Sequence, residues 1–119
     1  MKRGEVWTVS GGADYTNKPR PAVIIQEEGF DATDSITVCV FTTEAREASI
    51  IRLKIDPTER NGLKQPSRLM VDKVSSVPRT KMGTRLGRLD HGDISRLNEA
   101  LIVFLGLSRP INTDPTQAG

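Results

Sequence analysis

Apolar and polar residues alternate with the period of a β-strand along most of this chain, and a helical period appears only near the C-terminus. Such alternation marks half-buried strands, and short continuous apolar runs mark strands buried on both faces. The predicted strands span Gly4–Val9, Arg20–Gln26, Ile36–Thr43, Ile51–Ile55 and Ser67–Val74, with a short strand around Arg85–Leu89. Five or so strands followed by one helix predict a mainly β fold, a small, strongly curved sheet or partly open β-barrel.

The helix is predicted to follow Asp90, which suits an N-cap, with Asp93 completing a capping-box-like arrangement. Gly106 is expected to end it. The apolar residues of its predicted core face are Ile94, Leu97, Leu101, Phe104 and Leu105. Ile102 and Val103 lie off that face, which hints at a second apolar contact such as a subunit interface.

The 119 residues fit one domain, predicted over residues 1–107, with a flexible tail over residues 108–119 that contains two prolines. A net charge of +2 does not by itself identify a polyanionic partner. Cys39, the single cysteine, lies in a strand-like run and is expected to be a small core residue. No signal peptide and no apolar run of roughly 20 residues is seen, so a cytoplasmic protein without a membrane segment is expected.

The segment from Lys18 to Ile25 places an arginine between two prolines at the start of an apolar run. Each proline fixes its own φ and favours an extended conformation in the residue before it, so Arg20 has little backbone freedom. Two interpretations are open. Arg20 is either an anion-binding or catalytic group on a rigid mount, or a surface arginine at a strand edge.

Several short motifs, in order along nearly the whole chain, resemble the MazF/PemK family of toxin endoribonucleases. They are Arg3-Gly4-Glu5-Val6-Trp7, Lys18-Pro19-Arg20-Pro21-Ala22-Val23-Ile24, Val40-Phe41-Thr42-Thr43, Val71-Asp72-Lys73, and Gly87-Arg88-Leu89 before Leu97-Asn98-Glu99-Ala100-Leu101. The resemblance implies an SH3-like barrel with a C-terminal helix. It also implies a homodimer that cuts single-stranded RNA at short motifs without a metal or other cofactor, and a cognate antitoxin that blocks the RNA groove.

The resemblance also implies site residues. The family's catalytic arginine falls on Arg20 and its catalytic threonine on Thr42, with Thr43 at a neighbouring hydroxyl position. Some members use an Arg-x-Asp pair on a later strand. Asp72 matches the aspartate, but Met70 stands at the arginine position, which leaves an acid/base pair there open.

These residue types suit attack of a ribose 2′-OH on the adjacent phosphate, which leaves a 2′,3′-cyclic phosphate and a 5′-OH. Arg20 is suited to stabilise the phosphoryl charge and Thr42 to donate a hydrogen bond, although a strand threonine is as often satisfied by a carbonyl. The general base stays open between Asp72, which also suits a turn cap, and Glu5, which also suits a structural salt bridge. His91, the only histidine, is expected to be a surface residue, and one cysteine with one histidine does not support a zinc site or a catalytic triad.

RNA contact beyond the reacting centre requires positive charge and stacking surfaces. The predicted RNA-binding residues are Tyr15, Lys18, Thr43, Arg68, Arg79, Lys81 and Arg85. Arg68, two residues earlier on the same predicted strand face, is also a candidate to substitute in part for the arginine missing at Met70. Arg52 and Lys54 add an outward basic strand, and Tyr15 is placed to stack on a base. The alternative to an RNA-binding surface is a basic face that contacts only solvent.

Two other function classes fit a small barrel of this kind. A toxin of the same fold that poisons DNA gyrase depends on a C-terminal segment with a tryptophan, and this chain ends in Pro-Thr-Gln-Ala-Gly. A non-catalytic SH3-like binding module lines its groove with aromatic residues, and an aromatic fraction of 4% does not supply such a cluster.

Overall fold

The computed structural model describes residues 1–10, 18–30, 32–44 and 51–108. The strands are β1 (Glu5–Val9), β2 (Arg20–Ile24), β3 (Ser35–Thr42), β4 (Arg52–Ile55), β5 (Ser67–Pro78) and β6 (Met82–Arg88). Two short 3₁₀ helices, Glu28–Phe30 and Arg79–Lys81, and one α-helix, α1 (His91–Phe104), complete the described elements. Each predicted strand is present, and β5 and β6 are longer than predicted.

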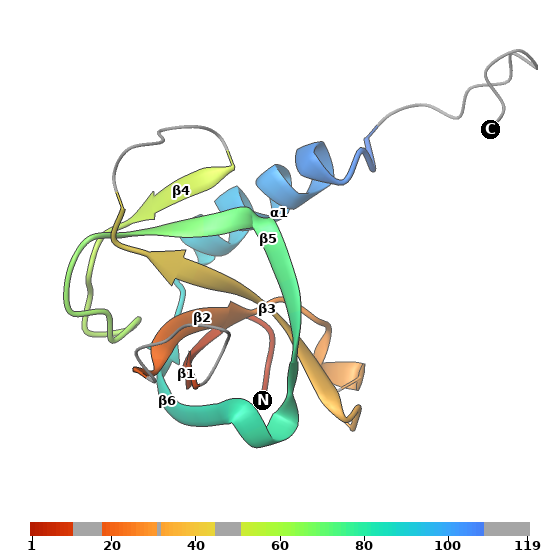
Figure 1. Ribbon diagram of the computed structural model, residues 1–119. Helices are drawn as coiled ribbons and strands as arrows, with labels where there is room; N and C mark the ends of the chain where they lie inside the picture. Colours follow the sequence, from red (N-terminus) through yellow and green to blue (C-terminus); the bar gives the residue numbers. More distant parts are fainter. Residues whose placement is uncertain (11–17, 31, 45–50, 109–119) are drawn as a thin grey trace, which may run out of the picture.

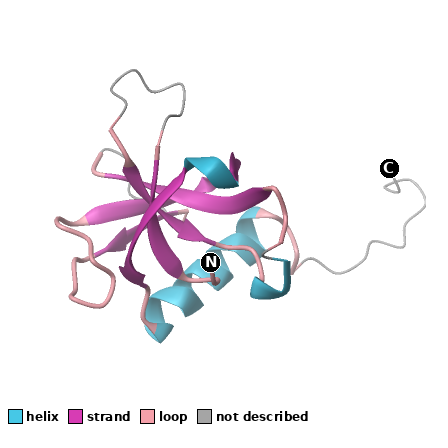
Figure 2. Cartoon of the chain, turned by 90° about the horizontal axis from the view of Figure 1, so that it is seen from below, coloured by secondary structure: helices cyan, strands magenta, loops and turns pink. Residues whose placement is uncertain are grey.

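The six strands form one antiparallel sheet in the order β4-β5-β3-β2-β1-β6. The described residues leave β4 and β6 as its two edges, so the sheet curls without closing into a full barrel (Figure 1). Seen from below, α1 runs along one side of the crossing strands (Figure 2). The predicted fold class, a partly open β-barrel with a C-terminal helix, is confirmed.

Strand β2 is buried on both faces, as its unbroken apolar run predicted. Val23 is fully buried in the main core, which lies between the sheet and α1. Ala22 and Ile24 point the other way, into a second buried cluster with Ile36 and Val38 of β3. Burying a valine or isoleucine side chain contributes about 1.5–3 kcal/mol, so this strand is fixed firmly and Arg20 at its start is fixed with it.

Cys39 lies in the main core, as predicted, and its thiol is unpaired. Burial raises the pKa of this thiol to about 11. Since the thiolate is the reactive form, Cys39 is an inert packing residue in the folded protein.

Strand β5 bends sharply between its first half, which pairs with β4, and its second half, which pairs with the start of β3. Cys39 is opposite Val74, but Phe41 is opposite Leu69, so β5 places the residues Met70–Lys73 against a single residue of β3. Extra residues on one strand bend it and increase the local twist. This bend lets β5 continue to Pro78, beyond the predicted end at Val74.

Helix α1 begins as predicted, because the backbone N–H of Asp93 donates to the Asp90 carboxylate at 2.8 Å. The predicted reciprocal half of the capping box is not formed, because the Asp93 carboxylate accepts from Arg96 at 3.0 Å and not from the Asp90 N–H. At the other end, Gly106 has φ +71° and the N–H of Leu107 donates to the Ile102 carbonyl at 2.9 Å, a Schellman-type ending.

The predicted core face of α1 is wrong in its last turn. Leu97 and Leu101 are buried, but Phe104 is 43% exposed and Leu105 53% exposed. The helix packs on β4 and β5, and its C-terminal turn extends past them (Figure 1). Apart from Ser108, the predicted tail lies outside the described residues. No helix within the described ranges is long and apolar enough to cross a membrane.

Candidate active site

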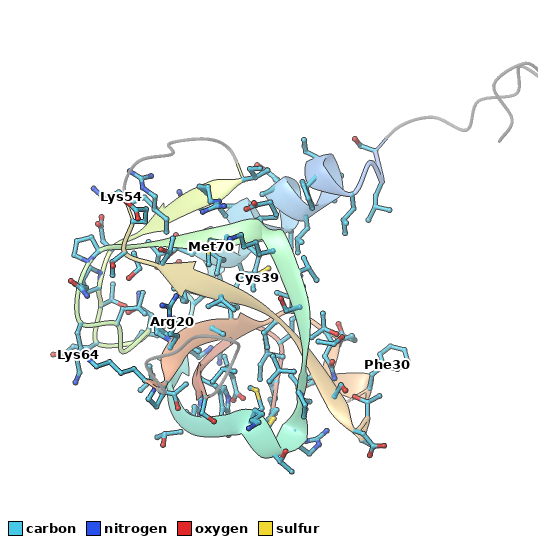
Figure 3. All side chains as sticks on the ribbon, viewed as in Figure 1. Arg20, Phe30, Cys39, Lys54, Lys64 and Met70 are labelled. Carbon is cyan, nitrogen blue, oxygen red and sulfur yellow. The ribbon has the colours of Figure 1, made fainter. Side chains whose placement is uncertain are left out.

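A cleft of about 790 Å³ opens where the start of β2, the end of β3 and the start of β5 meet. Its lining residues are Lys18, Pro19, Arg20, Pro21, Phe41, Thr42, Thr43, Glu44, Gln65 and Ser67. The cleft therefore gathers both residues to which the family resemblance gives a catalytic role, together with Lys18 and Thr43. Figure 3 shows Arg20 at this end of the molecule, on the side opposite Phe30.

Arg20 and Thr42 come together through the register of β2 and β3. The printed pairs end with Ala22 opposite Val40, and continuing this register by two residues places Arg20 opposite Thr42. Pro21 has no N–H to donate, so the ladder weakens at this point and the cleft opens between the two strands. Arg20 itself stays mounted on the sheet through its pairing with Val9 of β1.

The hydroxyl of Thr42 is held in a local turn. Its Oγ1 accepts a hydrogen bond from the backbone N–H of Glu44 at 3.1 Å. A hydroxyl that accepts at its oxygen keeps its own proton for donation. Among the described residues, the Thr42 hydroxyl donates to no carbonyl, which favours the functional interpretation of this side chain over the bland one.

Glu44 is the acidic residue of the cleft, and the sequence interpretation missed it. A charged residue directly after a strand normally faces solvent, so its residue type alone does not indicate a site. Its position two residues after Thr42 is the sequence signal that could have found it. The cleft combines two cations, Lys18 and Arg20, with this carboxylate. Such a set can bind an anion and accept a proton.

A row of polar side chains leads from the cleft across the sheet. Thr42 is opposite Arg68 on β5, and Arg68 is opposite Lys54 on β4. Opposed residues of antiparallel strands project from the same face. Arg68 and Lys54 therefore lie about 5 and 10 Å beyond Thr42, one and two strand spacings away. We call these three residues the cross-strand row.

Asp72 does not line the cleft. Arg52 donates to its two oxygens at 2.8 and 3.0 Å, and the two side chains are 14% and 24% exposed. The hydrogen bonds from Arg52 hold the pKa of Asp72 below its usual value, which weakens it as a proton acceptor. Arg52 lies on the outer face of β4 with Lys54, as predicted, but its guanidinium is paired with Asp72 and Lys54 is exposed. The catalytic role predicted for Asp72 stays a prediction, and the geometry does not favour it.

Glu5 forms a structural ion pair with Arg85, which is the structural alternative that the sequence suggested for it. Burial pushes its pKa upward, but hydrogen bonds from the Lys2 N–H and the Trp7 indole, with the charge of Arg85, bring the pKa below its usual value. Arg85 lies 3.2 Å from Glu5. Glu5 is not part of the cleft lining, and His91 is an exposed residue at the start of α1.

The remaining predicted RNA-binding residues are spread away from the cleft. Arg79 donates twice to the Thr33 carbonyl, at 3.1 and 2.9 Å, so its guanidinium braces the corner between β5 and β6. Lys81 is exposed, and its carbonyl accepts from the Ser10 N–H beside β1. Tyr15 lies outside the described residues. Within the described ranges, no three His, Cys, Asp or Glu side chains gather as a potential metal site.

Comparison with known proteins agrees with the family resemblance of the sequence motifs. The sequence model of a family described as PemK-like, MazF-like toxin of type II toxin–antitoxin systems matches residues 2–105. A protein of Mycolicibacterium smegmatis named probable endoribonuclease MazF is 47% identical over 108 residues, which span 91% of this chain and 99% of the relative.

Solved structures share the fold. The Mycobacterium tuberculosis toxin MazF-mt6 superposes with a TM-score of 0.74 at 24% identity, covering 88% of this chain and 99% of that one. A mycobacterial endoribonuclease in complex with its cognate antitoxin gives a TM-score of 0.75 at 20% identity, covering 92% and 99%. Sequence, fold and cleft agree, and the chain belongs to the PemK-like, MazF-like toxins of type II toxin–antitoxin systems.

Proposed function

We propose that this protein is a toxin endoribonuclease that cleaves single-stranded RNA at a short sequence motif, without a metal ion, and thereby inhibits translation. The observation that carries the proposal is the meeting of Arg20 and Thr42 in one cleft. Family membership supports it, and the relative at 47% identity is named as a probable endoribonuclease.

The reaction begins with the scissile phosphate beside Arg20. The ribose 2′ oxygen attacks phosphorus as the bond to the 5′ oxygen breaks, which yields a 2′,3′-cyclic phosphate and a 5′-OH end. The Arg20 guanidinium and the Thr42 hydroxyl stabilise the charge that develops on the phosphoryl oxygens. Because arginine does not readily give up its proton, Arg20 does not act as the base.

Glu44 is the proton acceptor that this cleft supplies. It takes the proton of the 2′-OH, and the departing 5′ oxygen receives a proton from water. Its backbone N–H donates to the Thr42 hydroxyl and its side chain lines the same cleft, which puts a carboxylate close to a phosphate bound there.

The setting of this activity is also proposed. A single-stranded RNA is the substrate and the cytoplasm the compartment. A cognate antitoxin holds the toxin inactive, as the solved complex of a mycobacterial endoribonuclease suggests by analogy. A homodimer is proposed, and the apolar residues exposed at the end of α1 support it as a subunit contact. They are Ile102, Val103, Phe104, Leu105 and Leu107.

The test is cleavage of a long mixed-sequence RNA by the pure protein in the presence of EDTA, with the cut sites and end groups mapped. We expect cuts at one recurring motif that leave 5′-OH ends. Arg20→Ala and Thr42→Ala are expected to lose about 10²-fold or more in rate while keeping the fold, and Thr42→Ser is expected to retain part of the activity.

Arg88→Ala is the matched control. Arg88 is exposed on β6 and opposes Glu5, at the end of β1 away from the Val9–Arg20 pair. The Arg88→Ala variant should cleave RNA at the wild-type rate. If the folded wild-type protein cuts no RNA, the proposal fails, and a gyrase-directed toxin or a binding module becomes the better interpretation.

A further inference from the structure

A second, smaller cleft of about 290 Å³ adjoins the catalytic cleft. The residues that line both are Pro19, Pro21, Thr43, Gln65 and Ser67. The two hollows are therefore continuous, and a chain molecule bound at Arg20 can place its next unit in the smaller one. We call this smaller hollow the side pocket.

The side pocket differs in chemistry from the catalytic cleft. Leu63 and Leu86 line it together with the two prolines, and these are apolar surfaces. Its volume lies just under the roughly 300–1,000 Å³ of ordinary small-molecule sites. A space of this size and character suits one flat, aromatic heterocycle that stacks on apolar side chains.

The wall of the side pocket is rigid. Asn61, only 2% exposed, accepts from the backbone N–H groups of Thr58 and Leu63, both at 3.0 Å, and donates to the Asp56 carbonyl at 2.9 Å. Gly62 has φ +71° and packs so closely on the Leu86 backbone that a Cβ atom there would collide. The pocket is thus formed before any ligand arrives.

Gln65 stands at the junction of the two hollows. Its carbonyl accepts from the Ser67 hydroxyl at 3.0 Å, which fixes the local turn. Its exposed side-chain amide makes no hydrogen bond to any described residue. An amide offers one donor group and one acceptor side by side, and this pattern pairs with the edge of a nucleobase. A base in the pocket would give this amide its partner.

We propose that the side pocket binds one nucleobase of the RNA next to the scissile phosphate, and that Gln65 reads the edge of that base. The inference rests on the proposed function for the identity of the ligand. It assigns one position of the cut motif to a defined set of residues, with stacking on Leu63, Leu86 and the prolines and discrimination by the amide.

The experiment measures base recognition separately from RNA cleavage. Fluorescent 2′-O-methyl RNA oligonucleotides cannot be cleaved, because they lack the attacking hydroxyl. Their dissociation constants are measured for a set that places each of the four bases at each position. Cut motifs are mapped in parallel on unmodified RNA. Wild type is compared with Gln65→Ala and Gln65→Glu, and Ser95→Glu on α1 is the control that adds the same charge at an exposed residue.

We expect Gln65→Ala to lose about tenfold or more of the discrimination between bases at one position and to leave other positions unchanged. Gln65→Glu should shift the preference at that position toward a base with an amino donor, such as cytosine, because a carboxylate only accepts. Ser95→Glu should match wild type. An unchanged preference in both Gln65 variants would overturn the inference, as would a wild-type protein that binds all oligonucleotides equally.

The two proposals fail in different ways. A protein that discriminates bases through Gln65 but cuts no unmodified RNA keeps the side pocket and loses the nuclease. Arg20→Ala should show the same separation by design, since it removes cleavage and keeps the base preference.

Discussion

Arg52 and Asp72 connect β4 to β5 through two hydrogen bonds, and Met70 stands directly opposite Arg52 in the strand pairing. In some members of the family, the resemblance implies an arginine at the position of Met70. In this chain the guanidinium that contacts Asp72 comes instead from the neighbouring strand. The Asp72 carboxylate is therefore paired with an arginine of β4, which the sequence of β5 alone does not reveal.

This pair makes stability depend on pH. The pKa of Asp72 is lower in the folded protein than in the unfolded chain, so its contribution is complete above the ordinary aspartate pKa and is lost as pH falls through the folded value. Near neutral pH, Asp72→Asn should lower the free energy of unfolding by about 1–3 kcal/mol, and at about pH 3 the difference should shrink. Urea unfolding at both pH values measures this. Asp34→Asn, at an exposed residue, is the control, and a pH-independent difference would contradict the prediction.

Removing the carboxylate of the cleft should slow the reaction without weakening RNA binding. Glu44→Gln is expected to lower the cleavage rate by about 10²–10⁴-fold, because the 2′-OH loses its proton acceptor. Affinity for a 2′-O-methyl RNA should stay equal or rise, since a negative charge has left the site. Single-turnover cleavage and fluorescence anisotropy measure the two quantities. Glu28→Gln, exposed on the first 3₁₀ helix, should do neither, and loss of binding in Glu44→Gln would assign Glu44 a structural role.

The cross-strand row should carry an RNA phosphate. Arg68 opposes Thr42, and the structure gives its side chain no ion pair with a described residue. Arg68→Ala is expected to weaken RNA binding for all sequences and to reduce the slope of log Kd against log salt by about 0.7. The cut motif should not change, because a phosphate contact carries no base information. Lys73→Ala, exposed on the same strand, tests specificity, and an equal effect there would indicate only the loss of general positive charge.

Replacing Asn61 should lower the free energy of unfolding more than replacing any exposed loop residue. Asn61→Ala leaves the N–H groups of Thr58 and Leu63 and the Asp56 carbonyl without their partner, and is expected to cost about 2–4 kcal/mol. Urea unfolding measures this, with Asn98→Ala on α1 as the control. In RNA cleavage at low temperature, the variant should keep cutting with a relaxed motif. Unchanged stability would show that the loop is held by other contacts.

The sequence alone predicted the elements whose cause is local. The apolar run after Pro21 gave β2 and its burial on both faces, and Asp90 gave the start of α1. The prolines around Arg20 indicated its rigid mount, and the resemblance brought in Thr42. These features depend on residues that are neighbours in the chain.

Features that depend on strand register could not be predicted in this way. The Arg52–Asp72 pair needs the β4–β5 alignment, and Glu44 lines a cleft that exists only after β2 and β5 flank it. The Asn61-Gly62 pair is typical of a turn, but the burial of Asn61 comes from a strand far along the chain. The exposed Phe104 follows from the limited extent of the sheet, which helical periodicity does not encode.

The anchoring of the loop by Asn61 has an evolutionary consequence. Asn61 holds the loop from the buried side, whereas Lys64 and Gln65 line the side pocket, so the support of the loop and its exposed residues are different amino acids. A lineage can exchange the exposed pair while Asn61, Gly62 and the β2 mount of Arg20 stay intact. The residues that support the loop and the residues that line the side pocket can therefore be exchanged independently of each other.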